Sequence, residues 1–285
     1  MSPTVTPFFH SATHSYAYVV ADPSSAAAAI VDPVLDFEPA SARTATLFAD
    51  AMLAHLRDRK LELRWVLETH AHADHLSAAG YVCAQTGAAL GIGAGIAAVQ
   101  AHFANLFGLE AQLAHEPDAF DARFGDGERI AFGALELQIV ATPGHTPDGV
   151  TYVIGDAAFV GDTVFQPDVG TARCDFPGAD AATLYRSIER ILALPEPMRL
   201  FHCHDYPPRG REPRAQSDAA GQRARNIHLA GRDEAAFVEL RTARDRTLPV
   251  PALLLPAMQW NLRGGRAPAR EANGIAYLKL PLDAI

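Results

Sequence analysis

A predicted strand that ends in a dense run of possible metal ligands constrains the fold of this chain more than any other feature. The apolar stretch Leu63 to Thr69 is followed at once by His70-Ala71-His72-Ala73-Asp74-His75. His70 and His72 are two residues apart in extended chain, so their side chains project from the same face. Four imidazole or carboxylate groups within six residues suit zinc, iron or manganese better than a metal that prefers thiolates. The fold must therefore place this strand end where further ligands can reach it.

Strand-like and helix-like segments alternate along most of the chain. The hydrophobic patterns predict strands over 15–21, 27–33, 63–69, 88–92, 129–132, 135–142, 150–154, 157–161 and 199–202. They predict helices over 41–60, 77–86, 95–107 and 180–194. Strands that alternate with helices in this order favour a layered α/β architecture.

Three further side chains of the metal-ligand type also follow predicted strands. His145 lies in Pro143-Gly144-His145-Thr146, Asp162 follows Gly161, and His204 begins His204-Asp205-Tyr206. Each of them alone is equally typical of an ordinary turn. Their shared position changes this interpretation, because loops at one edge of α/β sheets bring distant residues into one site. The sequence thus predicts one site assembled from four separate segments.

The charge balance narrows the range of partners. The 285 residues include 24 basic and 33 acidic side chains, which gives a net charge of −9. An acidic chain lacks the general attraction to phosphate backbones and anionic lipids, so we expect neither nucleic acid nor a membrane as partner. The long uncharged stretch 85–109 is interrupted by glycines and polar residues, and it is more typical of a strand and a helix than of a membrane span.

Cysteine usage and the N-terminal segment indicate the compartment. The three cysteines are widely spaced and form no C-x-x-C pair, which is poor material for a disulfide framework. The first basic residue is Arg43, so the charged start of a secretory signal is missing. We therefore expect a cytoplasmic protein.

The domain organisation follows from the absence of a low-complexity linker. We expect one catalytic domain over residues 1–230, with residues 231–285 forming a C-terminal helix and a Pro/Gly-rich extension packed on the same domain. The tail from Pro249 onward is expected to wrap either the core or the partner subunit of a homodimer.

The four ligand-bearing segments together resemble the metal motifs of the metallo-β-lactamase superfamily. The resemblance spans about residues 5 to 230 and implies an α/β fold, a four-layer αββα sandwich with the metal site at one edge. It implies two neighbouring metal sites that Asp162 can bridge. The first would use His70, His72 and His145, and the second Asp74, His75 and His204.

Within that superfamily the chain is most similar to the persulfide dioxygenases, also called sulfur dioxygenases. The similarity is carried by Glu68 to Ser77, Gly161 to Phe165, Arg173 to Phe176 and Cys203 to Tyr206. It implies one Fe(II) per chain, held by His70, His145 and Asp162, and oxidation of glutathione persulfide by O2 to sulfite and glutathione. Two histidines and one carboxylate leave three open positions on iron, which suits the binding of a substrate and O2 side by side.

The remaining ligand-type residues then have two interpretations. His72, Asp74, His75 and His204 either orient the iron ligands or hold a second metal, with zinc as an alternative to iron. By resemblance, Asp74, Arg173 and Tyr206 take part in catalysis.

Substrate-binding residues are also implied by resemblance. Glutathione carries two carboxylates, and a guanidinium is their better bidentate partner. Arg173 and Tyr206 are expected to line the substrate pocket, with Arg223 or His228 closing its far side. The arginines around 209–225 are equally consistent with a solvated surface.

Two other functions use the same residues. A thioester hydrolase of the glyoxalase II type would place two metal ions on the full ligand set, generate a bridging hydroxide and polarise a carbonyl. A metal-binding or redox-sensing module without turnover is the third hypothesis. An open coordination position argues against it, because structural metal sites are normally closed by four protein ligands.

Overall fold

Two stacked β-sheets form the centre of the computed structural model, which describes residues 1–116 and 118–285. The first sheet has the strand order β1-β2-β3-β6-β8-β9 and the second has the order β10-β11-β12-β13-β14-β15. The strands of the first are β1 (Thr4–His10), β2 (Ser15–Ala21), β3 (Ala27–Val31), β6 (Glu62–Leu67), β8 (Ala89–Gly93) and β9 (Ala122–Phe124). Those of the second are β10 (Arg129–Phe132), β11 (Leu135–Ala141), β12 (Val150–Ile154), β13 (Ala157–Phe159), β14 (Arg199–Phe201) and β15 (Gln216–Asp218).

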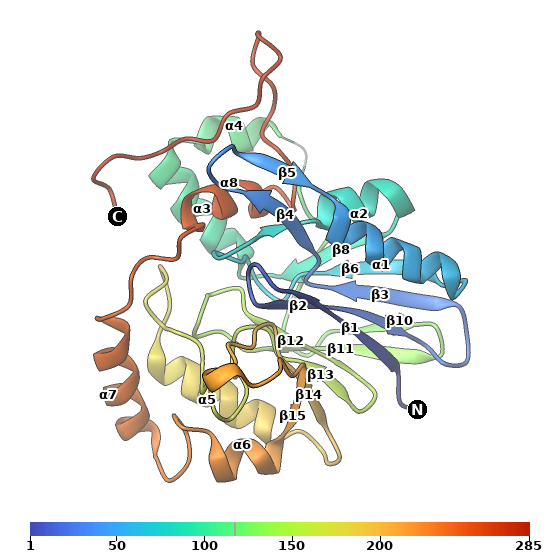
Figure 1. Cartoon of the computed structure of the whole chain (residues 1–285), viewed down its shortest axis with the longest axis vertical. Helices are drawn as coiled ribbons and strands as arrows, with labels where there is room; N and C mark the ends of the chain where they lie inside the picture. The colour runs from blue at the N-terminus through green and yellow to red at the C-terminus, as the bar shows by residue number, and fades with distance from the viewer. Residues whose placement is uncertain (117) are drawn as a thin grey trace.

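Helices cover the outer face of each sheet (Figure 1). The first sheet is covered by α1 (Leu47–Asp58), α2 (Ala79–Thr86), α3 (Ile96–Phe107) and α8 (Leu254–Asn261). The second is covered by α5 (Ala181–Leu192), α6 (Ala219–Arg225) and α7 (Glu234–Asp245). A short helix α4 (Glu110–His115) follows α3, and a single 3-10 turn spans Pro208–Gly210.

Three buried apolar clusters lie between these layers. One joins the first sheet to its helices, one fills the space between the sheets, and one joins the second sheet to α5 and α7. Alternation along β2 explains this, because Ala17 and Val19 face the helices whereas Tyr16, Tyr18 and Val20 face the other sheet. The four-layer αββα sandwich implied by the family resemblance is confirmed.

The main difference from the predicted elements lies before α1. The helix predicted over 41–60 begins only at Leu47, because residues Arg43–Ala45 form β5 and pair with β4 (Val34–Glu38). β4 also pairs with β7 (Leu76–Ser77) in a small separate sheet. This small sheet lies beside the predicted ligand segment and contributes to one wall of its cavity.

The C-terminal region adds two helices instead of the one predicted. Helix α7 packs against α5, and α8 packs against β7 and the first apolar cluster. Beyond Asn261 no further helix or strand is formed among the described residues, and the chain ends far from its N-terminus in Figure 1. Nowhere in the described ranges does a helix combine the length and the apolar character that crossing a membrane requires.

Candidate metal centre

The loop after β6 is anchored by a carboxylate at the end of the neighbouring strand. Asp32 directly follows β3, and its Oδ1 accepts a hydrogen bond from the backbone N–H of Thr69 at 2.7 Å. The same oxygen lies 3.1 Å from Nε2 of His72, while Oδ2 accepts from the Thr69 hydroxyl at 2.9 Å. Nε2 of His72 also lies 3.3 Å from a carboxylate oxygen of Glu68. The His72 ring is therefore fixed from behind by two acids.

Two further side chains fix the backbone of this loop. Asp148 accepts a hydrogen bond from the N–H of Ala71 at 2.7 Å. Asn261, the last residue of α8, donates from Nδ2 to the carbonyl oxygens of His72 at 2.7 Å and His75 at 2.9 Å. Its Oδ1 accepts from the N–H of Ser77 at 2.8 Å. The C-terminal helix thus braces the segment that carries most of the ligand-type side chains.

The first candidate ligand group comprises His70, His145 and Asp162. One ligand atom from each lies within 4.8 Å of the other two. Oδ2 of Asp162 is 4.0 Å from Nε2 of His70 and 3.8 Å from Nε2 of His145. Gly161 makes this approach possible, because it has a φ of +54° and a Cβ there would lie 2.7 Å from the Thr69 hydroxyl.

His145 is oriented through its other ring nitrogen. Nδ1 donates a hydrogen bond to the carbonyl of Arg173 at 2.7 Å, which leaves Nε2 facing Asp162. The next residue, Cys174, donates its N–H to Asp245 on α7 at 2.8 Å. Asp245 is in turn paired at 2.6 Å with the buried guanidinium of Arg241. Helix α7 therefore fixes the carbonyl that orients His145.

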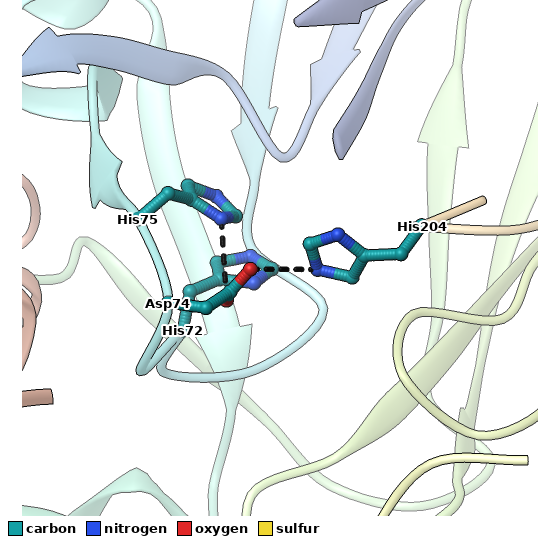
Figure 2. A group of neighbouring side chains, drawn as sticks. All are labelled: His72, Asp74, His75 and His204. Atoms are coloured by element: carbon teal, nitrogen blue, oxygen red, sulfur yellow. Dashed lines mark ion pairs between the residues drawn. The ribbon is translucent and has the colours of Figure 1, made fainter. Parts of the chain in front are cut away.

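The second candidate ligand group comprises His72, Asp74, His75 and His204, again with one ligand atom each within 4.8 Å of the others. Figure 2 shows Asp74 between His75 and His204, with an ion pair drawn from it to each of the two rings. The ion-pair distances are 3.4 Å to Nδ1 of His75 and 3.2 Å to Nε2 of His204. A ligand atom of His72 lies within this set, but its ring is as close to His70, with centroids 4.1 Å apart, as to His75, at 4.2 Å. The resemblance implied that His72 pairs with His70 and His145.

Asp162 lies between the two groups. Its Oδ2 faces His70 and His145, whereas its Oδ1 is 3.5 Å from Nε2 of His204. This position matches the bridging position that the resemblance implied for it.

The donor atoms that face this space fit a bound cation. Within the described part of the chain, Nε2 of His70, Nε2 of His75, Nε2 of His204 and Oδ1 of Asp162 are buried and make no well-aligned hydrogen bond, although Nε2 of His204 is in ion-pair contact with Asp74 and Asp162. Buried polar atoms in native proteins are nearly always satisfied, and leaving one without a partner costs about 1–3 kcal/mol. A metal ion at the first group would satisfy Nε2 of His70, and one at the second group would satisfy Nε2 of His75 and of His204.

The protonation preferences of three of these side chains, His70, His75 and Asp74, suit a cation. Burial raises the pKa of Asp162. Burial opposes protonation of His204, but the carboxylates of Asp162 and Asp74 outweigh it and raise its pKa well above the usual range. Burial, together with the neighbouring His72 and His145, holds the pKa of His70 well below its usual range. Burial lowers the pKa of His75 to about 4. Burial opposes ionisation of Asp74, but the nearby His204 and His75 outweigh it and hold its pKa well below the usual range. Neutral imidazoles and an ionised carboxylate are the forms that bind metals.

A cavity of about 900 Å³ reaches these groups. Asp74, His75, His145 and Asp162 contribute to its lining. Most of the remaining wall is apolar and comes from β4, Phe165 and the connection Leu248–Leu253 between α7 and α8. A molecule of drug or peptide size can therefore bind next to the ligand-type side chains.

Three of the four predicted substrate-binding residues line the cavity, and one does not. Arg173, Tyr206 and His228 line the cavity, and the Tyr206 ring stacks on that of His204 with centroids 5.5 Å apart. Arg223 does not line it, because it lies exposed on α6 with its guanidinium 3.4 Å from Glu189. The prediction that Arg223 closes the far side is therefore not supported.

The guanidinium of Arg173 is already engaged. It pairs with both carboxylate oxygens of Asp175 and donates from Nη1 to the carbonyl of Pro249 at 2.8 Å. It is therefore a poorer candidate for binding a substrate carboxylate than its place in the motif suggests.

Four residues that fix the ligand loops were not among those predicted from the sequence: Asp32, Asp148, Asp245 and Asn261. Asp32 carried a usable signal, since it follows a predicted apolar strand in the same way as the ligand segments do. Asp245 and Asn261 lie on helices whose placement against the loops depends on the whole fold, and no local pattern identifies them.

The chain is similar to several known proteins. Residues 11–204 match the family model described as the Metallo-beta-lactamase superfamily. A Burkholderia pseudomallei protein named a probable metallo-hydrolase is 47% identical over 99% of this chain and its own full length. A Xylella fastidiosa protein named beta-lactamase hydrolase-like protein is 49% identical, and this chain spans 66% of it. Glyoxylase B2 of Dictyostelium discoideum is 44% identical over 93% of this chain and 92% of its own.

The chain is more distantly similar to proteins named ETHE1. The mouse mitochondrial persulfide dioxygenase ETHE1 is 32% identical over 67% of this chain and 64% of its own length. The crystal structure of ETHE1 from Myxococcus xanthus superposes with a TM-score of 0.74 at 26% identity, covering 92% of this chain and all of that one. The matched family model and the relatives at 44% identity and above lead to one conclusion: the chain belongs to the metallo-beta-lactamase superfamily.

Proposed function

We propose that this protein is a non-haem iron persulfide dioxygenase that oxidises glutathione persulfide with O2 to sulfite and glutathione. The observation that carries the proposal is the set His70, His145 and Asp162, two histidines and one carboxylate that form a group without His72. Superfamily membership and the buried His/Asp cluster support a metal cofactor. The similarity to the persulfide dioxygenases supports the choice of reaction.

The two histidines among the proposed ligands are oriented by hydrogen bonds from their other ring nitrogens. The hydroxyl oxygen of Thr69 lies 3.1 Å from Nδ1 of His70, and the carbonyl oxygen of Arg173 accepts a hydrogen bond from Nδ1 of His145. Both histidines therefore direct Nε2 toward Asp162. An Fe(II) bound there would supply adjacent open positions for the terminal sulfur of the substrate and for O2.

The overall reaction balances with one water. Glutathione persulfide anion, O2 and water give glutathione, sulfite and one proton, and the two persulfide sulfurs together lose the four electrons that O2 gains. Side chains beside the proposed iron ligands shape the surroundings of the reacting atoms. Asp74 and His204 form an ion pair at the cavity, and Tyr206 covers the His204 ring. We infer that the released proton passes to solvent and that the apolar wall limits access of bulk water to the reacting atoms.

A thioester hydrolase of the glyoxalase II type is the second candidate. The complete second group around Asp74 and the bridging position of Asp162 favour it, because two metal ions could be held side by side. The similarity to the relative named Glyoxylase B2 points the same way.

Metal analysis combined with two assays separates these candidates. The purified protein is reconstituted with Fe(II) under argon, its metal content is measured, and O2 uptake and sulfite are followed after addition of glutathione persulfide. Hydrolysis of S-lactoylglutathione is measured in parallel. We expect about one iron per chain and equal amounts of O2 consumed and sulfite formed. Two metals per chain with thioester cleavage and no O2 uptake would establish the hydrolase instead.

A further inference from the structure

Three arginines line the cavity among the side chains that the structure describes, and two of them are already engaged. Arg173 is bound by Asp175 and the Pro249 carbonyl. Arg241 is buried, pairs with Asp245 and donates from Nη1 to the carbonyl of Thr171 at 3.2 Å. Neither guanidinium can bind a new anion without giving up its present partners.

The third arginine, Arg244, differs from both. It lies exposed in the last turn of α7, and no carboxylate or carbonyl of the described residues accepts a hydrogen bond from its side chain. It lines the metal-site cavity and also a neighbouring groove of about 710 Å³ along α7. His228 lines both hollows as well, so the two meet where Arg244 is placed.

The charges around this groove leave Arg244 available to an anion. Arg232 and Arg244 are its cationic side chains and Glu239 is its single acid, with no ion pair between Glu239 and either arginine. His228 adds no charge near neutral pH, because burial and the neighbouring arginines lower its pKa to about 4. The groove therefore has a net positive lining at the end of the cavity where the body of a bound thiol would extend.

We propose that Arg244 binds a carboxylate of the thiol that carries the persulfide, so that the substrates are persulfides of anionic, peptide-like thiols whose distal end lies in the α7 groove. This inference rests on the proposed function for the reaction but not for the binding of the thiol. A guanidinium held beside a carboxylate forms charge-assisted, often bidentate hydrogen bonds. Glutathione, with two carboxylates at the ends of a flexible chain, belongs to this class.

The test compares the iron-loaded wild type with Arg244→Ala and Arg244→Lys on two substrates. For glutathione persulfide we expect Arg244→Ala to raise KM about 10- to 100-fold with kcat nearly unchanged, which corresponds to one lost charge-assisted contact. Lysine should restore part of the loss, since it keeps the charge but not the planar fork. For the persulfide of uncharged 2-mercaptoethanol, KM should be the same in all three proteins.

The matched control is Arg246→Ala. Arg246 is exposed at the end of the same helix but does not line the cavity or the groove, so its KM for glutathione persulfide should equal that of the wild type. An unchanged KM in Arg244→Ala, or an equal rise for both substrates, would overturn the assignment.

A binding measurement keeps this inference separate from the proposed reaction. S-Methylglutathione, which cannot react, is titrated calorimetrically into the metal-loaded wild type and Arg244→Ala. A 10- to 100-fold weaker Kd in the variant supports the site even if no persulfide is oxidised. Equal Kd values overturn it even if the dioxygenase reaction is observed.

Discussion

The side-chain amide of Asn261 lies 2.7 Å from the backbone carbonyl of His72, so the last residue of α8 directly supports the loop of candidate ligands. The same nitrogen reaches the carbonyl of His75, and the amide oxygen accepts from Ser77. We expect Asn261→Ala to lower the free energy of unfolding by about 1–3 kcal/mol, because buried backbone groups lose their partners. Loss of such support should also weaken metal binding about 10- to 100-fold.

Chemical unfolding and competition with a chelator measure these two effects. Asn273→Ala is the control, since Asn273 lies exposed in the C-terminal tail, where its side chain bonds to Tyr277 and to the backbone N–H of Ile275. If Asn261→Ala bound metal as tightly as this control, the bracing role would be wrong.

The buried pair of Arg241 and Asp245 yields a second prediction. Asp245→Ala leaves the Arg241 guanidinium buried without its carboxylate, which should cost about 3–5 kcal/mol of unfolding free energy. The joint variant Arg241→Met with Asp245→Leu should recover most of that loss, because a buried ion pair often contributes little net stability. Urea titration monitors both proteins.

An exposed ion pair between α5 and α7 is the comparison. Arg186 and Glu234 are 2.6 Å apart at the surface, so Glu234→Ala should cost no more than about 1 kcal/mol. Equal losses in Asp245→Ala and Glu234→Ala would contradict the prediction.

Acid should destabilise the protein in part through His228. In the folded chain Nδ1 of this residue accepts from the N–H of Thr171 at 3.0 Å, and burial lowers its pKa from 6.5 to about 4. Between these two pH values the unfolded chain binds a proton that the folded chain does not, so stability falls as the pH drops from about 6.5 to about 4 and the loss levels off below that.

Unfolding curves collected from pH 7.5 to pH 4 test this contribution. Replacing the residue, His228→Gln, should make the slope of stability against pH shallower by up to about 1.4 kcal/mol per pH unit in this window. The same substitution at His102, on the exposed face of α3, is measured in parallel as a control for the loss of a histidine. Parallel slopes for the wild type and His228→Gln would refute the assignment.

Metal content should distinguish the two ligand groups. On the proposed function, His145→Gln loses the iron because it removes one of three ligands, whereas His204→Gln keeps about one iron per chain with reduced activity. Elemental analysis and a sulfite assay on both variants, with His115→Gln at the end of α4 as control, decide this. Loss of half the metal in His204→Gln would support two ions per chain.

The ligand-type residues could be predicted because their spacing is local. His70 and His72 share a face through strand geometry, and His145, Asp162 and His204 each follow an apolar strand, so the fold class alone brings them to one edge. The superfamily and the four-layer sandwich followed from the same motifs and are confirmed.

The supporting residues could not be predicted in this way. Asn261 is 189 positions from His72, and Asp245 is 71 positions from Cys174, so their contacts depend on where two helices dock. Arg223 illustrates the opposite error. Its place in an arginine-rich stretch suggested a role in binding, but the helix that carries it turns it toward Glu189. Local charge patterns do not determine which side of a helix faces a cavity.

The connection Leu248–Leu253 forms part of the cavity wall but carries none of the seven ligand-type side chains. Loops between helices accept changes in length and sequence more readily than the elements they join. Substitutions in this short connection would therefore change which thiols fit into the cavity without altering the ligand-type side chains. Among related proteins, divergence in substrate preference should accordingly appear first between α7 and α8 and last among the histidines.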